Sequence, residues 1–267
     1  MTKEDINGSE LLLVANEMAD AARSAILPFF RQQGLVADNK LEAGFDPVTE
    51  ADRAAELAMR EVLAIKRPDD AVFGEEFGHS DGRTGLTWVL DPIDGTRGFI
   101  SGTPTWGVLI AVSDDTGPLL GIIDQPYIKE RFIGGFGVAE VVGPHGTRPL
   151  KARAETALDE AILFTTFPEV GSDVEARAFQ AVAKKVKLTR YGTDCYAYAL
   201  VACGQVDLVI EAQLNAYDIQ GPIGVVEAAG GIVTDWQGNP APNGGRIIAA
   251  ANARVHAEAL QILSQFA

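Results

Sequence analysis

One segment constrains this chain more than any other: residues 88–96, with the sequence WVLDPIDGT. Its first half is an apolar run typical of a buried strand, and this run leads directly into two aspartates three positions apart. Asp91 and Asp94 supply the charged oxygens that hard cations prefer, and Pro92 between them stiffens the backbone. Gly95 then allows tight backbone geometry, so that nearby carbonyl and amide groups can also face a ligand. The segment therefore predicts a cation-binding corner at the end of a buried strand.

The bulk composition narrows the class of protein. A chain of 267 residues, 47% of them hydrophobic, is long enough for one large domain or two modest ones. Its formal charge of −15 disfavours nucleic acid as a partner, because phosphates need a basic face. No apolar run approaches the roughly 18 residues of a membrane span, and the first residues lack the pattern of a signal peptide. We therefore expect a cytoplasmic protein without a membrane partner.

A helix is expected after residue 49, with acidic residues near its start. Thr49 and Asp52 have the spacing of a capping box, in which side chains and backbone amides at a helix start satisfy one another. Asp46 falls in the turn just before this helix. An apolar stripe along one face is predicted at four positions: Ala54, Ala58, Val62 and Ile65.

The pattern of strands changes along the chain. After a short strand at residues 71–73, apolar runs at residues 108–112, 120–123, 131–135 and 139–142 recur at intervals of about ten residues, which predicts an antiparallel sheet. Beyond the loop at residues 144–149, predicted strands alternate with helices, as in α/β proteins. We therefore predict an N-terminal α+β domain over residues 1–146 and a C-terminal α/β domain over residues 147–267.

Four acids fall where carboxylates can converge. Glu75, Asp91 and Asp94 follow predicted strands, and Asp218 precedes a helix predicted over residues 219–229. Carboxylates at strand ends and helix starts can meet at one edge of a packed sheet, and four of them could bind two divalent ions. The alternative for each acid taken singly is a helix cap or a turn, and for Asp218 this alternative stays open.

Three separated motifs resemble the signatures of a known family. They are GEE at residues 74–76, WVLDPIDGT at residues 88–96, and YD at residues 217–218 followed by EAAGG at residues 227–231. In order and spacing they are similar to the three signatures of the inositol monophosphatase family. The similarity extends over nearly the whole chain, from DPVTEAD at residues 46–52 onward.

This resemblance implies a Mg²⁺-dependent phosphomonoesterase with the αβαβα layered sandwich of inositol monophosphatases and fructose-1,6-bisphosphatases. One sheet would be largely antiparallel and the other mixed, and the protein would be a homodimer. Two or three Mg²⁺ ions would be held by four side chains and one carbonyl, namely those of Glu75, Asp91, Asp94 and Asp218 and the carbonyl of Ile93. Asp46 and Thr96 would position the attacking water, and the amides of Gly95 and Thr96 would receive the phosphate.

The chemistry of phosphate-ester hydrolysis calls for such a set of groups. The reaction needs neutralisation of charge on the phosphoryl oxygens, an in-line water, and relief of negative charge on the leaving group. Metal coordination lowers the pKa of water from ~15.7 towards ~7 in favourable sites. Asp46 and Glu75 are then the candidates to accept or relay the proton of the water, while Thr96 orients the water through its hydroxyl.

Two stretches bear on which phosphate ester the chain would hydrolyse. RGFISGTPTWG at residues 97–107 and RYGTDCYAY at residues 190–198 are similar to the histidinol-phosphate phosphatases of the family. Asp194 stands where inositol phosphatases commonly have alanine. Histidinol phosphate carries an ammonium group and an imidazole, so its pocket should be acidic, and Asp194, Glu211 and Asp218 would contact it. The open alternative makes Asp194 a helix N-cap and Glu211 an acceptor for polyol hydroxyls.

The prediction is therefore a phosphatase for histidinol phosphate, a small-molecule phosphate monoester, with inositol-1-monophosphatase or a related sugar or nucleotide phosphatase as the alternative. A non-catalytic regulatory or binding protein with the same fold has little reason to retain Asp46, Glu75 and Thr96 together. A glycosidase would need two acids across a sugar cleft, whereas clustered acids before Gly-Thr suit phosphate better. Arg97 and Arg190 could reach substrate or a neighbouring subunit, but surface ion pairs are the favoured role for both.

Overall fold

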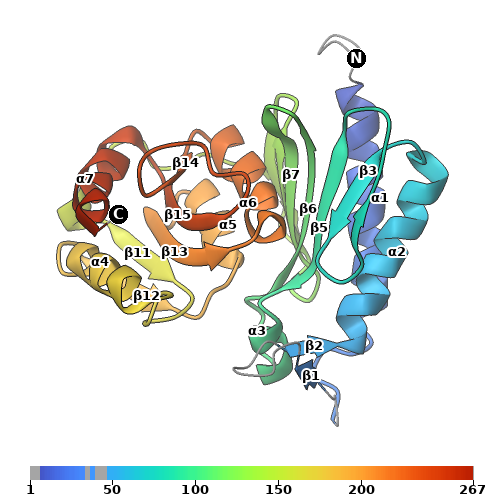
Figure 1. Cartoon of the computed structure of the whole chain (residues 1–267), viewed down its shortest axis with the longest axis horizontal. Helices are drawn as coiled ribbons and strands as arrows, with labels where there is room; N and C mark the ends of the chain where they lie inside the picture. The colour runs from blue at the N-terminus through green and yellow to red at the C-terminus, as the bar shows by residue number, and fades with distance from the viewer. Residues whose placement is uncertain (1–6, 34–36, 40–46, 267) are drawn as a thin grey trace.

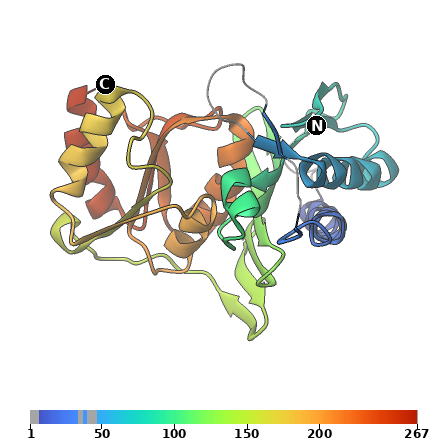
Figure 2. The same ribbon diagram turned by 90° about the horizontal axis from the view of Figure 1, so that it is seen from below.

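The computed structural model describes residues 7–33, 37–39 and 47–266. These residues form five stacked layers, in which two β-sheets alternate with three layers of helices (Figure 1). Seen from below, the outer helices lie at the two ends of the molecule and the two sheets enclose the middle helices (Figure 2). The resemblance implies this αβαβα arrangement, and the predicted fold class is confirmed.

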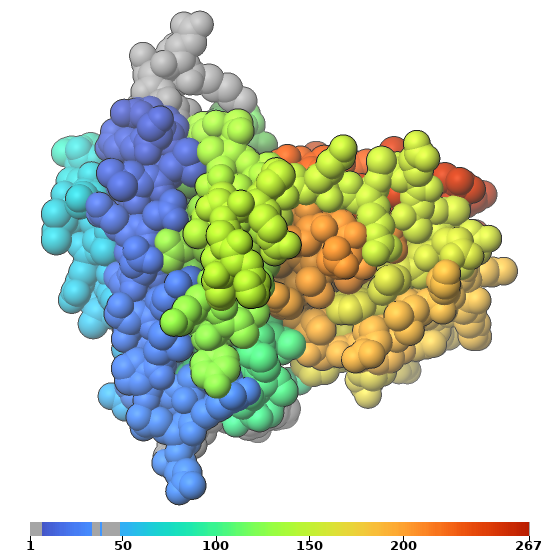
Figure 3. Space-filling model, turned by 180° about the vertical axis from the view of Figure 1, so that it is seen from behind, coloured from blue at the N-terminus to red at the C-terminus, as the bar shows by residue number. Residues whose placement is uncertain are grey.

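The helices divide among the three helical layers. Helices α1 (Gly8–Ile26) and α2 (Glu50–Lys66) cover the outer face of the first sheet, α5 (Tyr196–Ala202) and α6 (Ala216–Ala228) lie between the sheets, and α4 (Asp173–Ala183) and α7 (Ala253–Leu263) cover the second sheet. The short helix α3 (Thr96–Ser101) and two 3-10 turns, Leu158–Glu160 and Ser264–Phe266, complete the set in the described residues. From behind, blue α1 runs beside the yellow-green strands of the first sheet (Figure 3). The layers enclose three apolar cores.

The first sheet has eight strands and is largely antiparallel. Its strands are β3 (Ala71–Gly74), β4 (Gly78–Ser80), β5 (Thr87–Asp94), β6 (Gly107–Asp114), β7 (Gly117–Gln125), β8 (Glu130–Gly135), β9 (Val138–Gly143) and β10 (Gly146–Pro149). They lie in the order β10-β9-β8-β7-β6-β5-β3-β4, and β3 with β5 is the parallel pair. The antiparallel sheet predicted from the spacing of the apolar runs is confirmed for β6 to β9.

The second sheet has five strands and is mixed. Its strands are β11 (Ile162–Thr165), β12 (Leu188–Tyr191), β13 (Leu208–Leu214), β14 (Ile232–Asp235) and β15 (Gly245–Ala250). The strands lie in the order β12-β11-β13-β15-β14. Strand β11 runs parallel to its neighbours β12 and β13, and β15 runs antiparallel to its neighbours β13 and β14. A separate two-stranded ribbon pairs β1 (Ala37–Asn39) with β2 (Pro47–Thr49).

Helix α6 joins the two halves because the first sheet lets its backbone approach closely. A Cβ atom at Gly121 would lie 2.1 Å from the carbonyl oxygen of Gly221, and one at Gly134 would lie 2.3 Å from that of Gly224. Only glycine fits at such distances. The close approach carries the start of α6, where Asp218 lies, to the edge of the first sheet.

The buried face of α2 differs from the predicted stripe. The predicted capping box is present: Asp52 Oδ2 accepts a 2.8 Å hydrogen bond from the Thr49 amide. The face turned to the core, however, includes Asp52 and Glu56, whereas Ile65 of the predicted stripe is 78% exposed. The prediction is wrong because the apolar residues that pack on the core belong to a neighbouring row of the helix, namely Ala51, Ala55, Met59 and Leu63. Glu56 is buried since it accepts hydrogen bonds from the amides of Glu76 and Phe77.

The predicted boundary between the two domains lies near the point where the chain leaves the first sheet for the second. The division into two domains stays a prediction. Strand β10 keeps residues up to Pro149 in the first sheet, three residues beyond the predicted boundary at residue 146, and α6 packs on the sheet of the other half. Across the described ranges, no helix combines the length and the apolar character that crossing a membrane requires.

Replacing Gly121 with alanine tests the close packing of α6. We expect a loss of about 1–3 kcal/mol in the free energy of unfolding, because the added methyl group would meet the backbone of α6 and force the helix away. Gly143→Ala is the matched control, since a Cβ there meets the flexible side chain of Glu130 at 3.3 Å. Chemical denaturation of both variants measures the difference, and equal stabilities would contradict the packing argument.

Candidate active site

An acidic pocket of about 550 Å³ opens where the two sheets meet. Strand β5 and helix α3 contribute to it from the first half, and β13, α5 and α6 contribute from the second. Seven acids line it: Glu75, Asp91, Asp94, Glu169, Asp194, Glu211 and Asp218. Among the described residues of this lining, Arg97 is the one basic side chain. Arg190 lies instead on the exposed edge strand β12.

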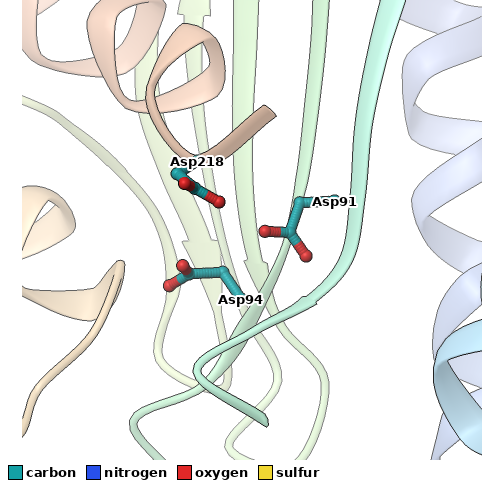
Figure 4. Close-up of side chains that lie close together, drawn as sticks. All are labelled: Asp91, Asp94 and Asp218. Atoms are coloured by element: carbon teal, nitrogen blue, oxygen red, sulfur yellow. The ribbon is translucent and has the colours of Figure 1, made fainter. Parts of the chain in front are cut away.

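A bulge in β5 brings Asp91 and Asp94 to the same side. In a regular strand, residues three positions apart face opposite sides of the sheet. Here Asp91 pairs with Leu109 of β6 but Asp94 pairs with Gly107, so three steps on β5 match two on β6. The stiff turn expected around Pro92 is therefore a bulge within a continuous strand. Both carboxylates consequently point into the pocket (Figure 4).

Asp218 completes a cluster of three carboxylates. Asp91, Asp94 and Asp218 each place one oxygen within 4.8 Å of the other two, and the side chains point into a common space (Figure 4). Asp218, the third residue of α6, is also the acid of the capping box at the start of this helix, because its Oδ2 accepts a 2.6 Å hydrogen bond from the amide of Asn215. The helix-cap alternative and the predicted position in the cluster are thus both realised. Three hard oxygen donors at this spacing fit a divalent cation such as Mg²⁺, whose binding here stays a prediction.

Burial and mutual repulsion shape the electrostatics of the cluster. Burial raises the pKa of Asp91 well above its usual value, and the charges of Glu75, Asp94 and Asp218 raise it further. The pKa of Asp94 is raised in the same way, first by burial and then by Asp194 and Asp218. Burial likewise raises the pKa of Asp218 to about 6. A bound cation would relieve this cost of ionisation.

Thr96 and Asp52 come together next to the cluster. The Thr96 hydroxyl lies 3.1 Å from the carbonyl oxygen of Ile93 and 3.4 Å from Asp52 Oδ1. Burial raises the pKa of Asp52 to about 6. The sequence analysis assigned Asp52 to the capping box, and its contact with Thr96, 44 residues away, could not be predicted from local spacing. Asp46, the predicted partner of Thr96, lies outside the described residues.

Glu75 lies at the end of β3, beside the strand that carries the aspartates. Its amide donates a 3.2 Å hydrogen bond to the carbonyl oxygen of Leu90, which fixes the backbone against β5. Its charge and its hydrogen bond with Asp91 both raise the pKa of that aspartate. The structure therefore brings Glu75 to the edge of the predicted cluster, while its predicted roles as metal ligand and proton acceptor stay predictions.

Asp194 links the cluster to the second half of the pocket. Its backbone is left-handed, with a φ of 44°, and the amide of the next residue, Cys195, donates a 2.6 Å hydrogen bond to Asp94 Oδ2. Its own carboxylate accepts a 3.1 Å hydrogen bond from Thr105. The alternative that Asp194 caps α5 is wrong, because Cys195 is the N-cap residue and no side chain caps this helix.

Gly95 is required by Asp194. It has a φ of 84° at the start of α3, and a Cβ atom there would lie 2.6 Å from the carboxyl carbon of Asp194. Any other residue would therefore be strained in its backbone and would push the carboxylate away. The predicted phosphate-binding pair, Gly95 and Thr96, lines the pocket beside Asp194.

Glu211 faces Asp194 from the second sheet. It is buried on β13, and its Oε1 accepts hydrogen bonds from the amide and the hydroxyl of Thr166 at 3.1 and 2.5 Å. Its Oε2 accepts a 2.7 Å hydrogen bond from the Tyr198 hydroxyl. Burial raises the pKa of Glu211 above its usual value. Thr166 and Tyr198, which hold this carboxylate in place, were not predicted from the sequence.

The five-layered fold and the cluster of carboxylates in its pocket define the class of the protein as a phosphatase with an αβαβα fold. Comparison with known proteins agrees. A sequence model of the inositol monophosphatase family matches residues 7–266, so the chain belongs to this family. The predicted resemblance is confirmed.

Individual relatives extend this similarity over the whole chain. The chain is 39% identical over 261 residues to the chloroplastic bifunctional phosphatase IMPL2 of Arabidopsis thaliana, covering 94% of this chain and 74% of that protein. It is 35% identical over 256 residues to a histidinol-phosphatase of Mycobacterium tuberculosis, covering 95% of this chain and 97% of that protein. The solved structure of an inositol monophosphatase from Zymomonas mobilis matches with a TM-score of 0.85 at 39% identity, covering 97% of this chain and 99% of the chain in that structure.

The raised pKa values predict how metal and pH affect stability. Between about pH 4 and 6 the folded protein holds the Asp218 proton more tightly than the unfolded chain does, so the metal-free protein loses stability as pH rises through this window. Mg²⁺ should therefore raise the melting temperature more at about pH 7.5 than at about pH 5.5.

Asp94→Asn identifies the source of this effect. Because it removes one repelling charge, the variant should melt higher than the parent without metal at neutral pH and respond less to Mg²⁺. Asp235→Asn, at the last residue of β14 and outside the pocket lining, is the control and should keep the full response to Mg²⁺. Thermal melts with and without Mg²⁺ give the result, and an unchanged Mg²⁺ response in Asp94→Asn would show that the cluster does not bind the metal.

Proposed function

We propose that this protein is a Mg²⁺-dependent phosphomonoesterase that hydrolyses L-histidinol phosphate to L-histidinol and inorganic phosphate. The observation that carries the proposal is the second acidic region of the pocket, formed by Asp194 and Glu211 in addition to the three-carboxylate cluster. A substrate with only hydroxyl groups gains little from two further carboxylates, whereas an ammonium or imidazolium group gains charge-assisted hydrogen bonds. The 35% identity to a histidinol-phosphatase supports the same substrate.

The carboxylates of Asp91, Asp94 and Asp218, with Glu75 and the Ile93 carbonyl beside them, would hold the metal. When bound, Mg²⁺ supplies positive charge that stabilises the phosphoryl oxygens and the leaving group and makes a water molecule easier to deprotonate. Gly95 and Thr96, which line the same part of the pocket, would bind the phosphate and so fix the ester for attack. Two or three ions per site stay our proposal.

Thr96 and Asp52 are the pair we propose to orient and deprotonate the attacking water. Asp52 Oδ2 is held by the amide and hydroxyl of Thr49, at 2.8 and 2.6 Å, while Oδ1 faces Thr96. With a pKa of about 6, Asp52 is ionised at neutral pH and can accept a proton through the Thr96 hydroxyl. Among the described residues the proposed proton acceptor is therefore Asp52, with Glu75 as a second candidate, and Asp46 stays a candidate from the sequence.

Asp52→Asn tests this role. We expect kcat to fall by about 100-fold or more, which is the usual contribution of a general base, and the parent rate to fall as pH drops through about 6. Asp70→Asn is the control, because Asp70 is another buried acid that accepts a hydrogen bond from Trp88 Nε1, and none of its hydrogen-bond partners lines the pocket as Thr96 does. Initial rates at saturating Mg²⁺ give the comparison, and a variant Asp52→Asn with most of the parent kcat would remove Asp52 from the mechanism.

The substrate is tested by phosphate release from L-histidinol phosphate and from inositol 1-phosphate, with and without Mg²⁺. Asp194→Asn keeps the shape of the side chain and tolerates a left-handed backbone, so it removes charge with little strain. We expect its kcat/KM for histidinol phosphate to fall by about 10- to 150-fold, and that for inositol phosphate to change little.

Two results would redirect this proposal. Equal or faster hydrolysis of inositol phosphate by the parent protein would favour the inositol-1-monophosphatase alternative, which the similarity to the Zymomonas mobilis structure supports. An absence of Mg²⁺-dependent release from any ester in folded protein would favour a regulatory role. The homodimer implied by the family resemblance is likewise a proposal, which sedimentation analysis of the purified protein can test.

A further inference from the structure

Arg97 occupies an unusual position in the pocket. It is the one basic residue among the described residues of a lining that also holds seven acids. Its charge lowers the pKa of Asp194, against the larger effect of burial, so its guanidinium lies close enough to that carboxylate to stabilise the ionised form. An arginine so placed either binds the phosphate of the substrate or occupies a place meant for another cation.

The face of an aromatic ring lies under the same guanidinium. Arg97 Cζ is 4.8 Å from the centre of the Phe167 ring, within the range of a cation–π interaction. Phe167 is 44% exposed and lines the pocket just after β11, so the contact joins the two halves of the molecule across the pocket. The guanidinium therefore covers part of an aromatic face that lines the pocket.

The aromatic face and the carboxylate together have the chemistry of a cation site. Phe167 offers the negative face of its ring, and Asp194 offers a carboxylate. Glu211, which lies near Asp194, makes the electrostatic potential there more negative. Neither feature attracts phosphate. Both attract ammonium, guanidinium and imidazolium groups, and an imidazole ring can also stack on Phe167.

We propose that Phe167 and Asp194 form the binding site for the cationic end of the substrate, and that the Arg97 guanidinium fills this site until the substrate displaces it. The proposal rests on the proposed function and names two more residues that determine its specificity. The substrate class is a phosphate monoester whose alcohol carries a positive charge within reach of the phosphate. Arg97 thereby offsets part of the negative charge around Asp194 in the empty pocket.

The kinetic test uses a pair of small esters that differ in charge, O-phosphoethanolamine and glycerol 2-phosphate, together with histidinol phosphate. The quantity measured is the ratio of kcat/KM for a cationic ester to that for the neutral ester. Phe167→Leu should lower this ratio by roughly 2- to 30-fold, the range of a cation–π contact. Arg97→Gln should raise the ratio, because the substrate no longer competes with the side chain.

The matched control is Phe77→Leu, which removes another exposed phenylalanine that lies beside an arginine. Phe77 is 49% exposed, with Arg60 Cζ 6.0 Å from its ring centre, and it lies outside the pocket lining. This variant should keep the parent ratio. A ratio unmoved by Phe167→Leu would overturn the proposal. So would an Arg97→Gln variant whose KM rises by the same factor for cationic and neutral esters, because that result would make Arg97 a phosphate ligand.

A binding measurement separates this proposal from the proposed function. Calorimetric titration with L-histidinol, which carries the cation but no phosphate, needs neither metal nor turnover. Binding should weaken in Phe167→Leu and tighten in Arg97→Gln, each by several-fold. If the parent protein failed to hydrolyse histidinol phosphate but these changes occurred, the proposed function would fail and the cation site would stand. Absence of histidinol binding at millimolar concentration in both the parent and Arg97→Gln would overturn the cation site.

Discussion

Repulsion among carboxylates at the end of β5 is the constraint on which the rest of the site depends. Asp91, Asp94 and Asp218 lie within 4.8 Å of one another, and burial limits the screening that water could provide. Each of the three accepts a hydrogen bond from a backbone amide, and the donors are Ile93, Cys195 and Asn215. These amides come from β5, from the start of α5 and from the start of α6. The cluster is therefore assembled by three elements that meet only in the folded protein, and it is in place before any cation binds.

Helix capping and site geometry are combined in the same side chains. Asp52 and Asp218 are each the third residue of a helix and the acid of its capping box. In each, the Oδ2 atom accepts the hydrogen bond that stabilises the helix start. The side chain is thereby fixed, and Asp52 turns its Oδ1 to Thr96 while Asp218 adds an oxygen to the cluster. A carboxylate has two oxygens, so a cap and a functional group are not exclusive alternatives. Each cap orders the side chain that the chemistry needs.

The parts that the sequence could predict are those carried by contiguous residues. The apolar run and the two aspartates of residues 88–96 lie within nine positions, so a strand leading into two acids was visible. The contact between Asp52 and Thr96 spans 44 residues and exists only because α2 packs against the first sheet. The bulge in β5 depends on its pairing with β6, and the position of the Asp194 carboxylate depends on the space that Gly95 leaves open. Such features arise from packing between distant segments, which residue patterns do not encode locally.

The distribution of charge in the pocket is the physical basis for the proposal that specificity and chemistry occupy different halves of it. The cluster on the β5 side can be neutralised by metal, and a phosphate can then approach it. Asp194 and Glu211 lie toward the second sheet, and their charges oppose the entry of a phosphate dianion. A positive group near them would offset this repulsion, and among the described residues of the lining Arg97 is the one that carries such a charge. A substrate that brings its own cation can replace that group and still present its phosphate to the cluster, whereas a polyol phosphate cannot. The proposed function follows from the same acids, since a pocket unfavourable for a simple anionic ester would select an ester that carries both charges.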